Sequence, residues 1–213
     1  MEKKFTRRQS VGEEIANTLS HGIGALLAAV GAVLLVGRGW MTGSGKTTVS
    51  LLVYGISLVL LYTASAAYHA VRNEKWKARL RVVDHCSIYL LILGTYIPMS
   101  LLVIGGKLGW LLCLTNATLA VLGITLTAID LKRFDKLSLV LYALMGWLAV
   151  VALKTILSVM SPLGMSLLIG GGLAYTVGIL FYRSKRSFMH FVWHLFVLLG
   201  SVLQYLCILV SCL

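Results

Sequence analysis

The spacing of histidines is the most informative chemical feature of this sequence. His190 and His194 stand four residues apart, so a helix would place both imidazoles on one face, with Cβ atoms about 5–6 Å apart. This spacing is common where two histidines chelate one metal ion. Alone it is a weak signal, because two hydrogen-bonded histidines at a membrane interface would show the same pattern.

Two further motifs carry groups that could complete a metal site. Ser65 and His69 are also four residues apart, which puts the serine one helical turn from the histidine on the same face. Asp84 and His85 form an ionisable pair at the entry to the third apolar stretch. A carboxylate facing lipid is costly, so we expect Asp84 to face the protein interior and pair with another polar group.

The elements that must position these residues are apolar helices. Of the 213 residues, 59% are hydrophobic and 12% charged, and the mean hydropathy is +0.91. A soluble domain of this size could not bury so much apolar surface, so the solvent must be lipid. Seven stretches are near or above the length that crosses a bilayer. We predict an all-α integral membrane protein, a seven-transmembrane helix bundle in a single domain over residues 1–213, with helices at 17–38, 47–71, 84–104, 108–129, 137–157, 163–182 and 189–211.

The distribution of positive charge predicts the orientation of this bundle. Fifteen of the nineteen lysines and arginines fall in the N-terminal segment and in the loops after the second, fourth and sixth helices. Positive residues in short loops mark the cytoplasmic face, so we predict a cytoplasmic N-terminus and a C-terminus outside. The net charge of +12 then reflects topology and attraction to anionic lipids, and we expect no nucleic-acid partner. The N-terminal group comprises Lys3, Lys4, Arg7 and Arg8; the longest loop, 72–83, contributes Arg72, Lys75, Lys77, Arg79 and Arg81.

Four motifs in this order resemble the haemolysin III family, the bacterial branch of the progestin and adiponectin receptor superfamily. They are Glu14-x-x-Asn17-x-x-x-His21, Ser65-x-x-x-His69, Asp84-His85 and His190-x-x-x-His194. The resemblance covers nearly the whole chain and implies a multi-pass protein of the bacterial cytoplasmic membrane. It also implies a Zn²⁺ ion held by His69, His190 and His194, with Asp84 contacting the metal-bound water and Ser65 near the site.

The chemistry of these residue types agrees with a catalytic zinc. Three neutral imidazoles leave a fourth coordination position open, which is the pattern of catalytic rather than structural zinc. Water on such a metal has a pKa of about 7, and a nearby carboxylate can orient it or take its proton. Ser65 could donate a hydrogen bond to a substrate carbonyl or an oxyanion. Imidazole-rich four-coordinate sites favour zinc without requiring it.

The remaining polar residues near the motifs are candidates for supporting the ligands. His85 lies about 100° around the helix from Asp84 and need not face the same metal. It could support the site, act as an alternate ligand or be an interfacial histidine. His21 shares one helical face with Glu14 and Asn17, and this polar stripe suggests hydrogen bonds to neighbouring helices. For His21 we favour a structural role over a catalytic one.

Three functions remain open from the sequence. The first is a zinc-dependent intramembrane hydrolase of lipid amide or ester bonds, similar to a ceramidase, with Asp84 as general base and Ser65 or the metal stabilising the oxyanion. Its substrate class rests on analogy with superfamily relatives. The second is a membrane-resident sensor or regulator of lipid homeostasis with a structural zinc. The third, suggested by the family name, is a pore-forming cytolysin, which we disfavour because no amphipathic insertion segment is visible. Membrane lipids are the expected partners, no soluble partner is implied, and the oligomeric state is open.

Overall fold

The computed structural model describes residues 9–213, and every regular element in this range is a helix. The basic residues Lys3, Lys4, Arg7 and Arg8, on which the predicted orientation partly depends, lie outside the described residues. In chain order the elements are α1 (Val11–Met41), α2 (Gly45–Ala70), α3 (Glu74–Pro98), the π-helical segment η1 (Met99–Ile104), α4 (Gly106–Trp147), the 3-10 segment η2 (Leu148–Ala152), α5 (Leu153–Val159), α6 (Pro162–Tyr182) and α7 (Met189–Cys212).

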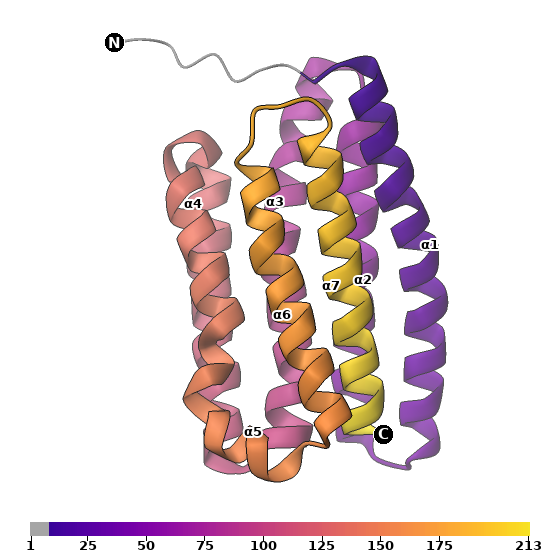
Figure 1. Cartoon of the computed structure of the whole chain (residues 1–213), viewed down its shortest axis with the longest axis vertical. Helices are drawn as coiled ribbons and strands as arrows, with labels where there is room; N and C mark the ends of the chain where they lie inside the picture. Colours follow the sequence, from indigo (N-terminus) through magenta and orange to yellow (C-terminus); the bar gives the residue numbers. More distant parts are fainter. Residues whose placement is uncertain (1–8) are drawn as a thin grey trace.

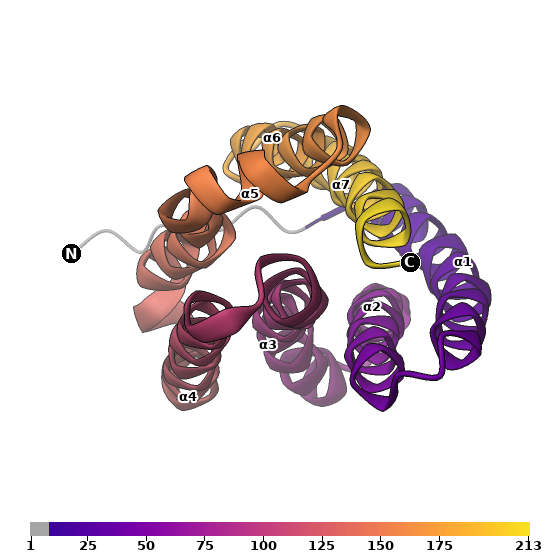
Figure 2. The same cartoon turned by 90° about the horizontal axis from the view of Figure 1, so that it is seen from below.

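The long helices lie side by side, and consecutive helices run in opposite directions (Figure 1). Seen from the end, α4, α3, α2, α1, α7 and α6 follow one another around the bundle, and the short α5 lies between α4 and α6 (Figure 2). As a result α1, α3 and α7 begin at the end of the bundle where α2 and α6 finish. This shared end, which we call the histidine end, carries all the motifs identified from the sequence.

Six segments of the described chain are long and apolar enough to cross a membrane. They are Val11–Met41, Gly45–Ala70, Glu74–Ile104, Gly106–Val159, Pro162–Tyr182 and Met189–Cys212. The prediction of an all-α, multi-span membrane protein is thereby confirmed. Six rather than seven segments are found because the predicted helices 108–129 and 137–157 fall within one of them, Gly106–Val159.

The helix α4 doubles back on itself at Asp130. The backbone there leaves the helical region, with φ −157° and ψ 92°. The Asn116 side-chain amide donates to the carbonyl oxygen of Met145 over 3.2 Å. In a straight helix, residues 29 positions apart would be separated by about 43 Å. The two arms of α4, before and after Asp130, therefore lie antiparallel against each other.

Two helices begin earlier than predicted, each at a clear N-terminal cap. Ser10 and Glu13 form a capping box that starts α1 at Val11 rather than at residue 17. The Asn73 side chain accepts the backbone N–H groups of Lys75 and Trp76 and starts α3 at Glu74 rather than at residue 84. The prediction of a long basic loop over 72–83 was wrong, because lysine and arginine are good helix formers and a capped helix accommodates them.

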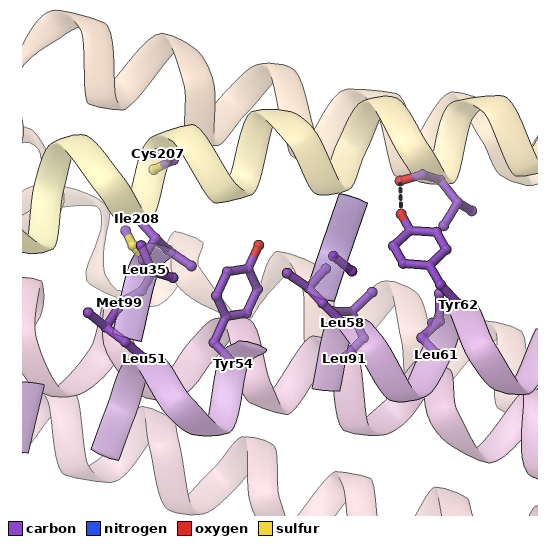
Figure 3. Packing of buried hydrophobic residues seen from close by; sticks show 12 residues of the cluster. Leu35, Leu51, Tyr54, Leu58, Leu61, Tyr62, Leu91, Met99, Cys207 and Ile208 are labelled. Carbon is purple, nitrogen blue, oxygen red and sulfur yellow. Dashed lines mark hydrogen bonds between the residues drawn. The ribbon is translucent and has the colours of Figure 1, made fainter. Parts of the chain in front are cut away.

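An apolar core joins α2 and α7 along the half of the bundle that lies away from the histidine end. Leu51, Tyr54 and Leu58 of α2 pack with Cys207 and Ile208 of α7 (Figure 3). Nearer the histidines, the Tyr62 hydroxyl donates to the carbonyl oxygen of Val197 over 3.3 Å (Figure 3). Gly24 of α1 lets this tyrosine approach, since a Cβ atom there would come within 2.8 Å of the Tyr62 ring. The relative positions of α1, α2 and α7 are therefore fixed by packing close to the site.

Candidate metal centre

Three histidines converge at the histidine end. His69 is the penultimate residue of α2, His190 is the second residue of α7, and His194 lies one turn further along α7. One ring nitrogen from each lies within 4.8 Å of the other two. The ring centroids of His190 and His194 are 4.8 Å apart, and that of His69 is 5.1 Å from each of them. The structure thus brings together the three histidines that the sequence selected as metal ligands.

Glu14 of α1 contacts the Nδ1 nitrogen of His69, one of the three clustered histidines. A carboxylate oxygen of Glu14 lies 2.7 Å from Nδ1 of His69. Because a carboxylate only accepts hydrogen bonds, Nδ1 of His69 carries a proton and Nε2 carries a lone pair. Nε2 is buried and has no hydrogen-bond partner among the described groups. A buried, unpartnered acceptor facing two other imidazoles is what a metal ligand awaiting its ion would present.

Further polar groups fix Glu14 itself. Its second carboxylate oxygen forms an ion pair with Lys77 Nζ at 2.9 Å. The same ammonium donates to the carbonyl oxygens of Tyr68 and Val71 at the end of α2, at 3.3 and 3.4 Å. Asn17 lies one turn along α1, with Nδ2 at 2.7 Å from Gln9 Oε1 and 3.5 Å from Nδ1 of His69. The sequence had placed Lys77 in a loop and gave no sign of this role.

His21 does not make the hydrogen bonds expected of the polar stripe on α1. Its ring stacks on that of His194, with centroids 3.6 Å apart and planes 9° apart, and forms a T-shaped pair with the Tyr62 ring, with centroids 5.0 Å apart. Neither ring nitrogen has a hydrogen-bond partner within the described part of the chain. Glu14 and Asn17 contact the neighbouring helix α2 as expected, whereas His21 stacks on the face of the His194 ring.

Asp84 and Ser65 lie next to the histidines, and Nδ1 of His85 lies 3.7 Å from an Asp84 carboxylate oxygen without being part of the three-histidine cluster. The Asp84 carboxylate lies close enough to the Ser65 hydroxyl and to His69 to interact with both. Asp84 is not part of the 4.8 Å cluster. Nδ1 of His85 donates to the backbone carbonyl of its own helix at Arg81 over 2.8 Å, and Nε2 lies 3.5 Å from the Tyr182 hydroxyl.

The residues present fit a divalent metal ion. Three imidazoles, two of them buried and one with an unpartnered nitrogen, form a donor set that suits zinc. Ligand nitrogens at 2.0–2.1 Å from a zinc ion lie at most about 4 Å apart, so the three side chains would close slightly around an ion.

An apolar cavity of about 150 Å³ runs beside the site between α3, the second arm of α4, α6 and α7. Its lining reaches from His85 and Tyr182 near the histidine end to Tyr96 and Gln204 deeper in the bundle. At its side, Trp147 Nε1 donates to Thr176 Oγ1 over 3.2 Å, and both side chains are exposed. This hydrogen bond bridges the second arm of α4 and α6 where the cavity approaches the lipid-facing surface.

These features define the class of protein as a multi-span helical membrane protein with a histidine cluster at one end of its bundle. The family described as haemolysin-III related matches residues 9–205, and the chain belongs to this family. Together with the six apolar segments long enough to cross a membrane, this family assignment identifies it as a protein of the bacterial cytoplasmic membrane.

Curated relatives agree with this assignment over almost the whole chain. Hemolysin-3 of Bacillus cereus is 41% identical over 98% of this chain and 96% of its own length. The Hemolysin-3 homolog of Bacillus subtilis (strain 168) is 41% identical over 95% of this chain and 96% of its own length. The human monocyte to macrophage differentiation factor is 27% identical over 91% of this chain and 82% of its own length. No solved structure matches the chain.

Proposed function

We propose that this protein is a zinc-dependent hydrolase that cleaves amide or ester bonds of membrane lipids at the histidine end of its bundle. One observation carries the proposal: His69, His190 and His194 converge beside Asp84 and Ser65, next to an apolar cavity. A zinc ion bound by the three imidazoles would supply Lewis acidity to a carbonyl group and a water molecule.

The roles of the other residues follow from their positions. Asp84 lies close enough to His69 to interact with it, yet outside the cluster, so its carboxylate is free to accept a proton from an attacking water molecule and return it to the leaving group. Ser65 orients that carboxylate through its hydroxyl and can turn to donate to the developing oxyanion. Glu14 keeps His69 in the tautomer that binds metal.

The cavity supports a lipid as the substrate. Its lining is mainly apolar, and along α3 it extends from His85 to Tyr96, about 17 Å of helix. An acyl chain could lie there while the polar linkage of the lipid reaches the histidines. The Trp147–Thr176 hydrogen bond lies between the cavity and the bilayer, so we expect lipids to enter by parting this contact.

The proposal includes seven membrane crossings with the histidine end in the cytoplasm. Each arm of α4 is about as long as a bilayer-spanning helix, and the turn at Asp130 is followed by Lys132, Arg133 and Lys136. With α4 counted as two crossings, the basic residues of this turn and of the segment between α6 and α7 lie at the histidine end. Cysteine labelling with a membrane-impermeant reagent, at residue 133 and at residue 45, would test the orientation. Labelling of residue 133 in intact cells would contradict it.

The decisive experiment compares zinc-loaded wild type with Asp84→Ala across a panel of ceramides and phospholipids. We expect the wild type to release fatty acid from at least one lipid and Asp84→Ala to lose at least a hundredfold in rate, as is typical when a general base is removed. Asp130→Ala, which removes a carboxylate at the turn of α4, serves as the matched control and should turn over normally. Equal, background-level turnover by wild type and Asp84→Ala would contradict the proposal.

A membrane sensor with a structural zinc is the second candidate. One observation favours it: the histidines and Glu14 tie α1, α2 and α7 together at one end, as a structural clip would. In that case His69→Ala should lower stability while Asp84→Ala leaves the biological function intact. Liposome leakage without lipid turnover would instead favour a pore.

A further inference from the structure

The helix α1 supplies none of the three clustered histidines, yet its side chains reach both of the buried ones. Glu14 contacts Nδ1 of His69 at 2.7 Å. Two turns further along α1, the buried Ser20 places its hydroxyl oxygen 3.1 Å from Nδ1 of His194. In both contacts a side chain of α1 lies against the Nδ1 nitrogen of the imidazole.

The direction of the Ser20 contact follows from the other hydrogen bond of this serine. Its hydroxyl donates to the backbone carbonyl oxygen of Asn17 over 2.9 Å. A hydroxyl has a single proton, so the Ser20 oxygen is left to accept from His194. Nδ1 of His194 thus faces an acceptor and carries the proton.

A neutral imidazole has one N–H group, so a proton held on Nδ1 leaves Nε2 with its lone pair exposed. His21, stacked at 3.6 Å on the His194 ring, limits tilting of that ring. The hydrogen bond of Ser20 and the stacking of His21 together fix which nitrogen His194 offers and the plane in which it lies.

We propose that Ser20 is a positioning residue of the metal centre, which holds Nδ1–H of His194 so that Nε2 binds the ion, as Glu14 does for His69. The inference rests on the proposed metal site, but not on the reaction carried out there. It predicts that His69 and His194 already present Nε2 to the metal position in the metal-free protein. Preorganised ligands of this kind typically gain 10–100-fold in metal affinity.

The test compares zinc affinity, measured by chelator competition on detergent-purified protein, for wild type, Ser20→Ala and Ser20→Thr. We expect Ser20→Ala to bind zinc about 10–100-fold more weakly and Ser20→Thr, which keeps the hydroxyl, to recover most of the loss. The matched control is Ser57→Ala: Ser57 is similarly buried and donates to a carbonyl three residues back, and among residues 9–213 its only hydrogen-bond partner is Tyr54. This control should bind as wild type.

A second measurement determines directly which ring nitrogen of His194 binds the metal. Nitrogen-15 spectra of ring-labelled histidine in the zinc-loaded protein should show a protonated Nδ1 and a metal-bound Nε2 for His194, assigned by comparison with the His194→Ala protein. Wild-type zinc affinity in Ser20→Ala, coordination of His194 through Nδ1, or absence of zinc binding by the wild type would each overturn the inference. Because neither readout requires turnover, weak binding by Ser20→Ala in a protein that hydrolyses no lipid would support this inference while contradicting the proposed function.

Discussion

The carboxylate of Glu14 lies 2.7 Å from Nδ1 of His69, across the interface between α1 and α2. Its other oxygen lies 2.9 Å from the ammonium of Lys77 on α3. A carboxylate behind a ligand histidine fixes the tautomer of the ring and raises its basicity. Glu14 therefore links α1 to both α2 and α3 and fixes the orientation of the His69 ring.

Replacing Glu14 by glutamine should weaken metal binding while leaving the fold in place. The amide keeps the shape of the side chain but loses the charge that His69 and Lys77 share, so we expect zinc affinity to fall about 10–100-fold. Chelator competition measures the change. Glu74→Gln removes a carboxylate from the exposed start of α3 and should bind zinc normally. Equal affinities for the two variants would mean that Glu14 does not support the ligand.

Each clustered histidine should be required for metal retention. We expect one zinc ion per chain in the wild type and loss of that zinc in His69→Ala, His190→Ala and His194→Ala, measured by elemental mass spectrometry on purified protein. Three imidazoles are the minimum set for such a site, and removing one leaves two. His85→Ala is the control, because His85 hydrogen-bonds within α3 and toward Tyr182 instead. Zinc retained in His190→Ala would contradict the three-histidine site.

Removing the metal should lower thermal stability. An ion that binds only the folded state stabilises it by about 4 kcal/mol when its concentration is a thousand times the dissociation constant. We therefore expect chelation to lower the unfolding temperature of the wild type and of His85→Ala, and to leave that of His194→Ala unchanged. A chelator effect of equal size in His194→Ala would show that the stabilising ion binds elsewhere.

The sequence could select the three histidines that converge in the structure because their pattern is local. His190 and His194 are one helical turn apart, and His69 falls at the end of an apolar stretch, so both the face and the depth of each could be derived. The contact between Glu14 and His69 joins residues 55 positions apart, and only the packing of α1 against α2 reveals it. Ser20 was missed because a serine in an apolar helix gives the same signal when it merely packs.

The helix boundaries failed for a different physical reason. Charge was taken to mark loops, so the basic first turns of α3 were assigned to a loop, although Asn73 caps a helix there. The fold-back of α4 at Asp130 was predicted as a loop between two helices, and the structure places a sharp backbone turn at its first residue. If capping residues such as Asn73 had been considered before charged residues were assigned to loops, the start of α3 would have been predicted correctly.

The approach of α3 to α4 should be sensitive to a single methyl group at Gly123. A Cβ atom there would come within 2.2 Å of the rigid Tyr89 ring. We expect Gly123→Ala to cost about 1–3 kcal/mol, the usual penalty of overpacking, seen as a lower unfolding temperature in detergent. Gly172→Ala on α6 is the matched control, since a Cβ atom there meets no atom within 4 Å. A drop of the same size in the control would point to a general effect of helix substitution rather than to this contact.

Narrowing the cavity should discriminate between lipids by chain length. Ala143 and Leu144 are consecutive exposed residues on the second arm of α4, and of the two only Ala143 lines the cavity. In Ala143→Phe the added ring would occupy space that the proposed acyl chain needs, so we expect the KM for a long-chain substrate to rise about tenfold, or about 1.4 kcal/mol of lost binding. A short-chain analogue should be affected less, because it does not reach this depth.

Zinc content should remain at the wild-type level, since Ala143 is not one of the clustered residues. Leu144→Phe adds similar bulk to the outer surface of the same helix and should leave both substrates unaffected. If Ala143→Phe and Leu144→Phe gave the same kinetics, the acyl chain would have to bind somewhere other than in this cavity.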